Sequence, residues 1–351
     1  MNKYIIYNLI TILLVVLGLG FFAAFTIYYD PMFHYHGPQD NMSYALDIND
    51  ERYVATGIAR HFDYDSMICG SSVNENFKTT QFDELFNAKS IKVPISGGYM
   101  KEVAEIIDAG FETHKNLKYI LRSIDTYFIS SADEVNPDAI DVSYLVNKNP
   151  LDDVFYLFNF DVFIGKTLRN RSLTKSKMPS TTFDDYASWS KESEFGVFEY
   201  NADELNEIPQ QINLFDYEVA HIKKNIEENI LKTIREHRDT QFLLYYVPYS
   251  AVYYLSARQT YSLKRFLDCE RLVFEMLSDE PNVKIYGFST DFDMCCNLEN
   301  YRDSAHYGEW INEKILKDMA ADKNRITKVN AEDYFNKIYN YYIKYKIKWK
   351  E

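Results

Sequence analysis

The sequence predicts an α/β fold in which helices cover both faces of a five-stranded parallel sheet, preceded by one transmembrane helix. Two observations predict the sheet. Short apolar runs end at Gly, Pro or polar residues, and segments with helical spacing alternate with these runs. This alternation is typical of strand–helix–strand units, because parallel strands need a crossover connection. A third observation, a long apolar run near the N-terminus, predicts the membrane helix.

Each expected strand is a short apolar segment closed by a turn residue. In chain order, the strands are expected at Ser66–Cys69, Ser90–Ile95, Lys118–Ile124, Gln241–Val247 and Val283–Phe288.

Helices are expected before, between and after these strands. Met100–Lys115 shows the pattern best, because Val103, Ala104, Ile107 and Phe111 recur at helical spacing. The other expected helices are Arg52–Phe62, Asn74–Asn87, Asp216–His237, Arg258–Leu277 and Tyr307–Ala321.

The apolar run Tyr4–Tyr29 is long enough to cross a bilayer, for which about 20 apolar residues suffice. A cleaved signal peptide is the alternative, but the run ends in Thr26-Ile27-Tyr28-Tyr29, which is not a small-residue cleavage site. Lys3 and the amino terminus are the only charges before the run. We therefore expect a single-pass plasma-membrane protein with its N-terminus inside and an extracytoplasmic domain.

Composition excludes several classes of protein. Of 351 residues, 46% are hydrophobic and 26% are charged, which is typical of a globular chain. The formal net charge of -14 disfavours nucleic acid as a partner, since phosphate binding needs clustered Lys and Arg. Four cysteines do not make a disulfide scaffold, and we expect neither a metal site nor a cofactor.

We expect four parts along the chain. These are a membrane anchor over 1–30, a juxtamembrane connector over 31–60, an α/β domain over 61–325 and an aromatic, basic helix over 326–351. An insertion over about 126–215 interrupts the domain, and it would form a cap beside the site. The C-terminal helix fits two interpretations equally, a membrane-interface helix or a helix packed on the domain.

Three segments near strand ends or before a helix carry residues that could take part in catalysis. Gly70-Ser71-Ser72 follows the first strand, Ser96-Gly97-Gly98 follows the second, and Asp303-Ser304-Ala305-His306 precedes the last helix. Active-site residues of open parallel sheets collect at the carboxyl ends of strands. A histidine can take the proton of a serine hydroxyl, and a carboxylate on the other ring nitrogen fixes the tautomer.

This arrangement resembles the SGNH hydrolase superfamily over roughly residues 61–325. The resemblance implies a three-layer α/β/α, flavodoxin-like fold with Ser72 as nucleophile, Asp303 as orienting acid and His306 as base. Backbone N–H groups of Ser72 and of Gly97 or Gly98 would form the oxyanion hole.

The sequence departs from the family at the third strand. That strand ends Arg122-Ser123-Ile124-Asp125, where the family carries an asparagine of the oxyanion hole, and an ionised Asp125 cannot donate a hydrogen bond. With the N-terminal anchor, this resembles a membrane-anchored sub-group that acylates cell-envelope polymers, such as the lipoteichoic-acid D-alanylation and alginate O-acetylation proteins. The sub-group implies a membrane-bound O-acyltransferase as partner and a cell-surface polymer as substrate.

Two main functions follow as alternatives. The first is an acyltransferase or esterase working through an acyl-Ser72 intermediate. The second is a catalytically degenerate domain that binds the polymer or serves as a scaffold for the acyltransferase. Ser71, Asp125 and Arg122 are further candidates for binding substrate, although Arg122, on an inner strand, could instead pair with Asp125 or Asp108.

Overall fold

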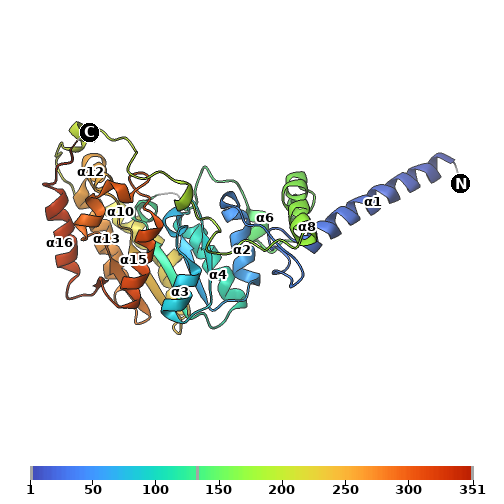
Figure 1. Cartoon of the computed structure of the whole chain (residues 1–351), viewed down its shortest axis with the longest axis horizontal. Coiled ribbons are helices and arrows are strands. Elements are labelled where there is room, and N and C mark those ends of the chain that lie inside the picture. The colour runs from blue at the N-terminus through green and yellow to red at the C-terminus, as the bar shows by residue number, and fades with distance from the viewer. Residues whose placement is uncertain (1–2, 132–133, 349–351) are drawn as a thin grey trace. The chain divides into compact units, whose positions relative to one another are not determined.

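The computed structural model describes residues 3–131 and 134–348, which form two compact units (Figure 1). The first unit combines Met1–Phe62 with Ile140–Thr182, and the second combines Asp63–Ala139 with Phe183–Glu351. The insertion expected over residues 126–215 is therefore divided between the two units.

The second unit is built on a six-stranded sheet with the strand order β2-β1-β3-β4-β5-β6. Neighbouring strands from β2 to β5 pair in parallel, and β6 pairs antiparallel with β5. The parallel sheet predicted from the sequence is thus extended by one antiparallel strand, which is too short to show a periodic pattern. The strands are β1 Ser66–Gly70, β2 Ser90–Pro94, β3 Tyr119–Ile124, β4 Gln241–Tyr246, β5 Val283–Gly287 and β6 Arg325–Ile326.

Every residue of β1 and β2 is buried. Successive side chains of a strand point to opposite faces, so both faces of the sheet are covered at these strands. This explains why Met67–Cys69 is a continuous apolar run instead of an alternating one. Lys92 is a charged residue in this core, and its Nζ donates a hydrogen bond to the backbone carbonyl of Glu75.

Helices of the second unit pack in groups along the sheet. α3 packs against α15, α10 packs against α13, and α16 packs against both α12 and α13. The longer helices are α3 Thr79–Phe86, α4 Met100–Thr113, α10 Asp216–Ile226, α12 Ala251–Thr260, α13 Leu263–Leu277, α15 Glu309–Ala320 and α16 Ala331–Tyr342. The shorter segments are η2 Ser72–Asn74, α5 Thr126–Ser130, η4 Ser190–Glu192, α9 Ala202–Leu205, η5 Glu227–Leu231, α11 Lys232–Glu236, α14 Phe292–Cys296 and η6 Leu298–Asn300.

Two expected helices differ from the structure. The helix expected over Asn74–Asn87 begins only at Thr79, because Asn76 bonds to a distant part of the chain instead of continuing a helix. The helix expected over Arg258–Leu277 is broken at Ser262, which has a φ of 75° and caps α13 by accepting a hydrogen bond from the Arg265 N–H.

The C-terminal helix α16 is packed on the second unit. Tyr334, Phe335, Ile338 and Tyr342 are buried, and the Tyr342 ring stacks on Tyr254 of α12 with centroids 4.5 Å apart. Of the two interpretations of the tail, the structure shows the packed helix. The four cysteines are free, and Cys69, Cys269 and Cys295 are buried.

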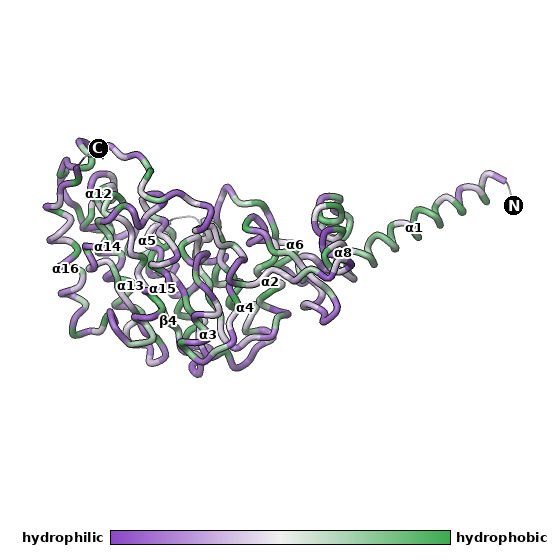
Figure 2. The backbone as a smooth tube through the Cα atoms, in the orientation of Figure 1, coloured by the Kyte–Doolittle hydropathy of each residue, from purple (hydrophilic) through white to green (hydrophobic). Residues whose placement is uncertain are grey.

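The first unit contains α1 Lys3–Tyr29, η1 Ile48–Asp50, α2 Glu51–His61, α6 Ser143–Val146, α7 Val154–Leu157, η3 Val162–Thr167 and α8 Leu168–Lys175. α1 is 27 residues long and is apolar enough to cross a membrane (Figure 2). Polar side chains occur in it only as isolated Asn and Thr residues after Lys3.

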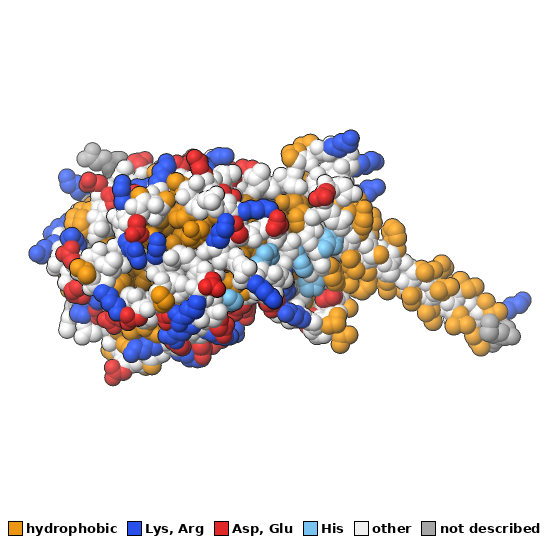
Figure 3. Space-filling model, turned by 90° about the horizontal axis from the view of Figure 1, so that it is seen from below, with side chains coloured by type: hydrophobic (Ala, Val, Ile, Leu, Met, Phe, Trp, Pro, Cys, Tyr) orange, Lys and Arg blue, Asp and Glu red, His pale blue; other side chains and the backbone are white. Residues whose placement is uncertain are grey.

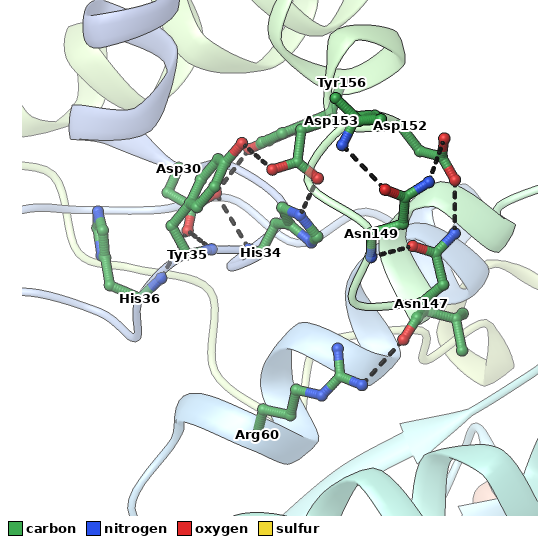
Figure 4. A network of polar contacts seen from close by, with 12 residues as sticks. Asp30, His34, Tyr35, His36, Arg60, Asn147, Asn149, Asp152, Asp153 and Tyr156 are labelled. Carbon is green, nitrogen blue, oxygen red and sulfur yellow. Dashed lines mark hydrogen bonds and ion pairs between the residues drawn. The ribbon is translucent and has the colours of Figure 1, made fainter.

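Asp30 ends α1 and organises the turn that follows (Figure 4). Its Oδ1 accepts hydrogen bonds from the Tyr156 hydroxyl at 2.7 Å and from the backbone of His34 at 3.1 Å. Its Oδ2 accepts from the backbones of Tyr35 at 2.7 Å and His36 at 2.9 Å. Because Asp30 is fully buried, these bonds fix the turn at the end of α1.

Candidate active site

The first strand ends in a turn that only glycine can make. Gly70 has a φ of 137°, and a Cβ there would lie 2.5 Å from Asn74 Oδ1 and 2.6 Å from Ser123 Oγ. After this turn, Ser71 is buried, whereas Ser72 begins the single helical turn η2 and is partly exposed. The backbone thus separates the environments of two adjacent serines.

Hydrogen-bond contacts link Ser72 to His306, and His306 to Asp303. Ser72 Oγ is 2.7 Å from His306 Nε2. On the other side of the ring, Nδ1 lies 2.9 Å from Asp303 Oδ1 and 2.8 Å from Oδ2. This is the geometry of a nucleophile, a base and an orienting carboxylate.

The turn that carries His306 is held by its own backbone. Asp303 Oδ1 accepts hydrogen bonds from the backbone N–H groups of Ala305 and His306, both at 2.9 Å. Arg302 N–H donates to the His306 carbonyl at 2.9 Å, and an antiparallel bridge joins Tyr301 to Tyr307. The imidazole is therefore oriented by a closed turn as well as by the carboxylate.

Asp303 is held in its ionised form. Burial raises the pKa of this carboxyl, but the hydrogen bonds from the His306 ring and from the two backbone N–H groups outweigh it and lower the pKa to about 2. An ionised Asp303 accepts from an Nδ1–H, and this leaves Nε2 without a proton and able to accept the Ser72 hydroxyl proton.

The three residues expected to form the oxyanion hole, Ser72, Gly97 and Gly98, differ in their backbone hydrogen bonds and conformation. The Ser72 N–H belongs to the first residue of η2, where a helical turn leaves N–H groups without partners inside the turn. Gly98 differs from the expectation, because its N–H donates to the Ile95 carbonyl at 2.8 Å. Gly97 has a φ of 60°, and its carbonyl accepts from the Asn136 amide at 3.1 Å. The α-helix after η2 begins only at Thr79, so its dipole does not start at Ser72.

Asp125 lies in a buried cluster of hydroxyl groups. It accepts hydrogen bonds from Ser71 Oγ, Ser123 Oγ and the Tyr249 hydroxyl, each at 2.8 Å. Ser71 and Asp125 are 2% and 4% exposed, so neither can contact a substrate as the sequence suggested. The three bonds give Asp125 a structural role behind the site.

Arg122 also differs from the sequence expectation. Its guanidinium is buried and donates to the backbone carbonyls of Asn229 at 2.9 Å and Met100 at 3.2 Å. Burial lowers the pKa of this guanidinium from its ordinary value. Arg122 therefore ties β3 to the segments beside it instead of facing a substrate.

Trp189 is a neighbour of the site that the sequence did not identify. Its ring meets the His306 ring edge-on with centroids 5.8 Å apart, and the Arg302 guanidinium lies 4.7 Å above it. Asn76 Oδ1 holds this segment by accepting from the backbone N–H groups of Trp189 and Ser190, both at 3.1 Å. The repeated asparagines in Ser72-Val73-Asn74-Glu75-Asn76 were the available signal for such a turn.

A cavity of about 480 Å³ lies beside the Asp303–His306 turn, with Ser304 in its wall. Its walls carry aromatic rings such as Tyr127, Tyr253 and Phe266, together with several Ser and Thr hydroxyls. The charged residues that line it, Glu218 and Arg265, form an ion pair with each other.

This cavity adjoins the buried cluster behind the two serines. The Tyr253 ring in its wall stacks on Tyr249 with centroids 3.9 Å apart, and Tyr249 bonds Asp125. Ser250, which begins the segment that carries Tyr253, bonds the Ser304 carbonyl through both its N–H and its Oγ. These contacts tie the walls of the cavity to the buried cluster and to the turn that carries His306.

Within residues 3–131 and 134–348, no group of three or more His, Cys, Asp or Glu side chains could hold a metal ion.

No family model matches the chain, and no curated protein matches it. Among solved structures, it is similar to a Streptococcus pneumonia protein provisionally described as a platelet activating factor, with 14% identity, a TM-score of 0.41, and coverage of 78% of this chain and 92% of that one. It is also similar to an acetyl xylan esterase from the rumen bacterium Butyrivibrio proteoclasticus, with 9% identity, a TM-score of 0.34, and coverage of 73% and 62%. Values this low leave the functional argument to the geometry of the site.

Proposed function

We propose that this chain is a membrane-anchored, SGNH-type serine esterase or O-acyltransferase that modifies a cell-surface polysaccharide. The observation that carries the proposal is the 2.7 Å contact between Ser72 Oγ and His306 Nε2, with Asp303 on the opposite ring nitrogen. A hydroxyl becomes a useful nucleophile only when a base can take its proton, and this contact supplies the base.

In the first step, Ser72 Oγ attacks the carbonyl carbon of an acyl donor while its proton passes to His306 Nε2. The negative charge on the carbonyl oxygen is stabilised by the backbone N–H of Ser72 and by a donor of the turn at Gly97. The tetrahedral intermediate then expels the leaving oxygen, which takes the proton from Nε2 and leaves an acyl-Ser72 ester.

In the second step, His306 Nε2 takes a proton from an incoming hydroxyl, whose oxygen attacks the acyl-Ser72 carbonyl. A water molecule as acceptor gives hydrolysis, and a polymer hydroxyl gives transfer. The proton then returns to Ser72 Oγ as the ester bond breaks, which restores the starting state. Asp303, with its pKa lowered to about 2, stays ionised and stabilises the imidazolium in both steps.

The cavity beside the Asp303–His306 turn supports a neutral sugar as acceptor. Sugars present apolar C–H faces and hydroxyl groups, and the cavity combines aromatic rings with Ser and Thr hydroxyls. Its Glu218–Arg265 pair leaves no excess charge for a polyanion. A neutral polysaccharide therefore fits this wall better than a teichoic-acid-like chain.

The membrane part of the proposal rests on α1, which is long and apolar enough to span a bilayer. We place the domain outside the cell, with a membrane-bound O-acyltransferase as the source of the acyl group. Protease added to intact, wall-stripped cells is expected to digest the domain. Digestion that occurs only after lysis would place the site in the cytoplasm.

Trapping of the acyl-enzyme tests the chemistry directly. Full-length protein in detergent, treated with p-nitrophenyl acetate and quenched in acid, is expected to carry an acetyl group on the peptide containing Ser72 by mass spectrometry. Ser72→Ala should lose the adduct, whereas Ser71→Ala should retain it. A folded wild-type chain that forms no adduct but binds polysaccharide would favour the degenerate, polymer-binding alternative.

A further inference from the structure

The segment 151–164 of the first unit exposes an unusual concentration of large apolar side chains. They are Leu151 at 77% exposure, Val154 at 47%, Phe155 at 63%, Phe158 at 42%, Phe160 at 69% and Ile164 at 47%. We call these six residues the 151–164 apolar surface. Soluble domains rarely expose so many large apolar groups of one short segment to water, so this segment is expected to contact an apolar partner.

Ring contacts join this segment to the end of α1. Phe163 stacks on Phe22 with centroids 4.1 Å apart and lies 5.7 Å from Phe25, and Phe158 lies 6.3 Å from Phe22. A helix rises about 1.5 Å per residue, so these contacts fall within roughly 10 Å of the end of α1 at Tyr29. The 151–164 apolar surface therefore lies at the level where the membrane helix ends.

α1 itself is bare along most of its length. Residues 3–21 are exposed, and partial cover begins only at Phe22 (Figure 3). The hydrocarbon region of a bilayer is about 30 Å thick, and it would cover the apolar surface of this exposed part of α1. Since the covered part of α1 follows directly, the side chains that cover it face the boundary between hydrocarbon and headgroups.

The charges around the surface fit that boundary. Asp161 is exposed within the segment, which excludes burial in the hydrocarbon centre. Arg171, Lys175 and Lys177, which follow on and after α8, are exposed in a chain whose net charge is -14. Exposed aromatic and aliphatic groups beside basic residues are typical of elements that lie in the headgroup region.

We propose that the 151–164 apolar surface inserts into the interfacial layer of the same bilayer that α1 spans. The occupant of the surface is lipid, and the chain holds the membrane at two places, by a spanning helix and by an interfacial segment. Hydrogen bonds of Asp30 to the Tyr156 hydroxyl and to the turn after α1 connect the two places (Figure 4). This inference depends on the anchor and not on the chemistry of Ser72.

Spin-label accessibility in lipid nanodiscs tests it with matched positions. Phe160, Tyr7 in α1 and Tyr217 in α10 are 69%, 70% and 70% exposed. Each is replaced by cysteine in a full-length Cys296→Ser background, because the other three cysteines are buried. Collisions of the attached nitroxide with molecular oxygen and with a water-soluble nickel chelate are then measured. The Phe160→Cys label is expected to lose nickel collisions and gain oxygen collisions, as Tyr7→Cys does, whereas Tyr217→Cys keeps its nickel collisions.

Several results would overturn the inference. One is a Phe160→Cys label that collides with nickel as often as Tyr217→Cys does while Tyr7→Cys is protected. Another is protection at 160 that appears only in native membranes, or only with spin–spin broadening between copies, because a protein would then cover the surface. Nickel collisions at Tyr7→Cys would remove the anchor itself. Phe155→Cys, as a second exposed position, must give the same result as Phe160→Cys.

Discussion

Ser71 and Ser72 are neighbours in the chain but belong to two polar clusters with different properties. Ser71 points to Asp125, which is buried and also accepts from Ser123 and Tyr249. Ser72 points to His306, whose side chain is 25% exposed and whose ring is held by Asp303. The buried cluster has its acceptor filled by hydroxyl donors, whereas the exposed cluster pairs a donor with a base. This difference shows why Ser72, and not Ser71, is the candidate nucleophile: its hydroxyl is accessible, and its hydrogen-bond partner is a base.

The largest expected effect is the loss of ester turnover when Ser72, in the exposed cluster, is replaced. Ser72→Ala removes the proposed nucleophile, so the proposed esterase turnover should fall by roughly 10⁴-fold or more. Its free energy of unfolding should change by only about 1 kcal/mol, because one partly exposed hydrogen bond is lost. Turnover of a soluble ester and urea unfolding of the same preparation measure both quantities. Turnover that survives in Ser72→Ala would exclude this serine as the nucleophile.

The second prediction concerns the orienting carboxylate. Asp303→Asn keeps the shape of the turn but allows the His306 tautomer that carries its proton on Nε2, which cannot accept from Ser72. We expect a loss of about 10³–10⁴-fold in kcat. Because the pKa of Asp303 is lowered to about 2, the wild-type carboxylate stays ionised over the range of the assay. A variant with nearly normal kcat would show that the contact with Asp303 does not set the tautomer.

The third prediction addresses the buried cluster through stability. Asp125→Ala leaves three hydroxyl donors without their acceptor, at about 1 kcal/mol each, so we expect a loss of roughly 3 kcal/mol in the free energy of unfolding. Turnover per folded molecule should stay within about tenfold of wild type. The matched control Ser71→Ala removes one donor and should cost about 1 kcal/mol. Chemical denaturation gives both values, and equal losses for the two variants would contradict the cluster.

The fourth prediction compares two carboxyl groups with opposite pKa shifts. Burial raises the pKa of Glu270 to about 8, and Thr126 Oγ1 donates a hydrogen bond to this carboxyl at 3.0 Å, whereas the pKa of Asp303 is lowered. Folding therefore favours protonated Glu270. The contribution of protonated Glu270 to the stability of the fold is fully present below its unfolded-state pKa, near 4.5, and is lost as pH rises through its folded-state pKa of about 8.

Glu270→Gln removes this titration while keeping the shape of the side chain. We expect the variant to gain on the order of 2 kcal/mol over wild type at pH 8 and little at pH 5. Thermal unfolding at the two pH values measures the gain. A wild-type protein whose stability rises from pH 5 to pH 8, with the variant unchanged, would show that Glu270 folds in its ionised form.

The sequence predicts much of the frame because the strands are buried on both faces. β1 to β5 lie within a residue or two of their expected positions, because strands that are buried on both faces have continuous apolar sequences. The start of α3 at Thr79, instead of at Asn74, could not be predicted. Asn76 takes its partners from Trp189 and Ser190, which lie more than 100 residues away. Local propensity cannot anticipate such a contact.

The site was only partly predictable for a similar reason. Ser72, His306 and Asp303 could be chosen because a strand end and a short Asp-x-x-His turn fix their directions locally. Whether Ser71 and Asp125 face the substrate depends on the Tyr249 hydroxyl from a distant part of the chain. The neighbour Trp189 lies in an irregular segment, which shows no period that a sequence pattern could reveal.

Covalent labelling with a fluorophosphonate probe tests the central claim most directly, because this reagent reacts with serines that a base has activated. Full-length protein is labelled, digested and mapped by mass spectrometry, alongside Ser71→Ala, Ser72→Ala and His306→Ala. The account predicts a phosphonyl adduct on Ser72 in the wild type and in Ser71→Ala, and none in the other two variants. An adduct on Ser71, or labelling that persists in a folded Ser72→Ala protein, would contradict it.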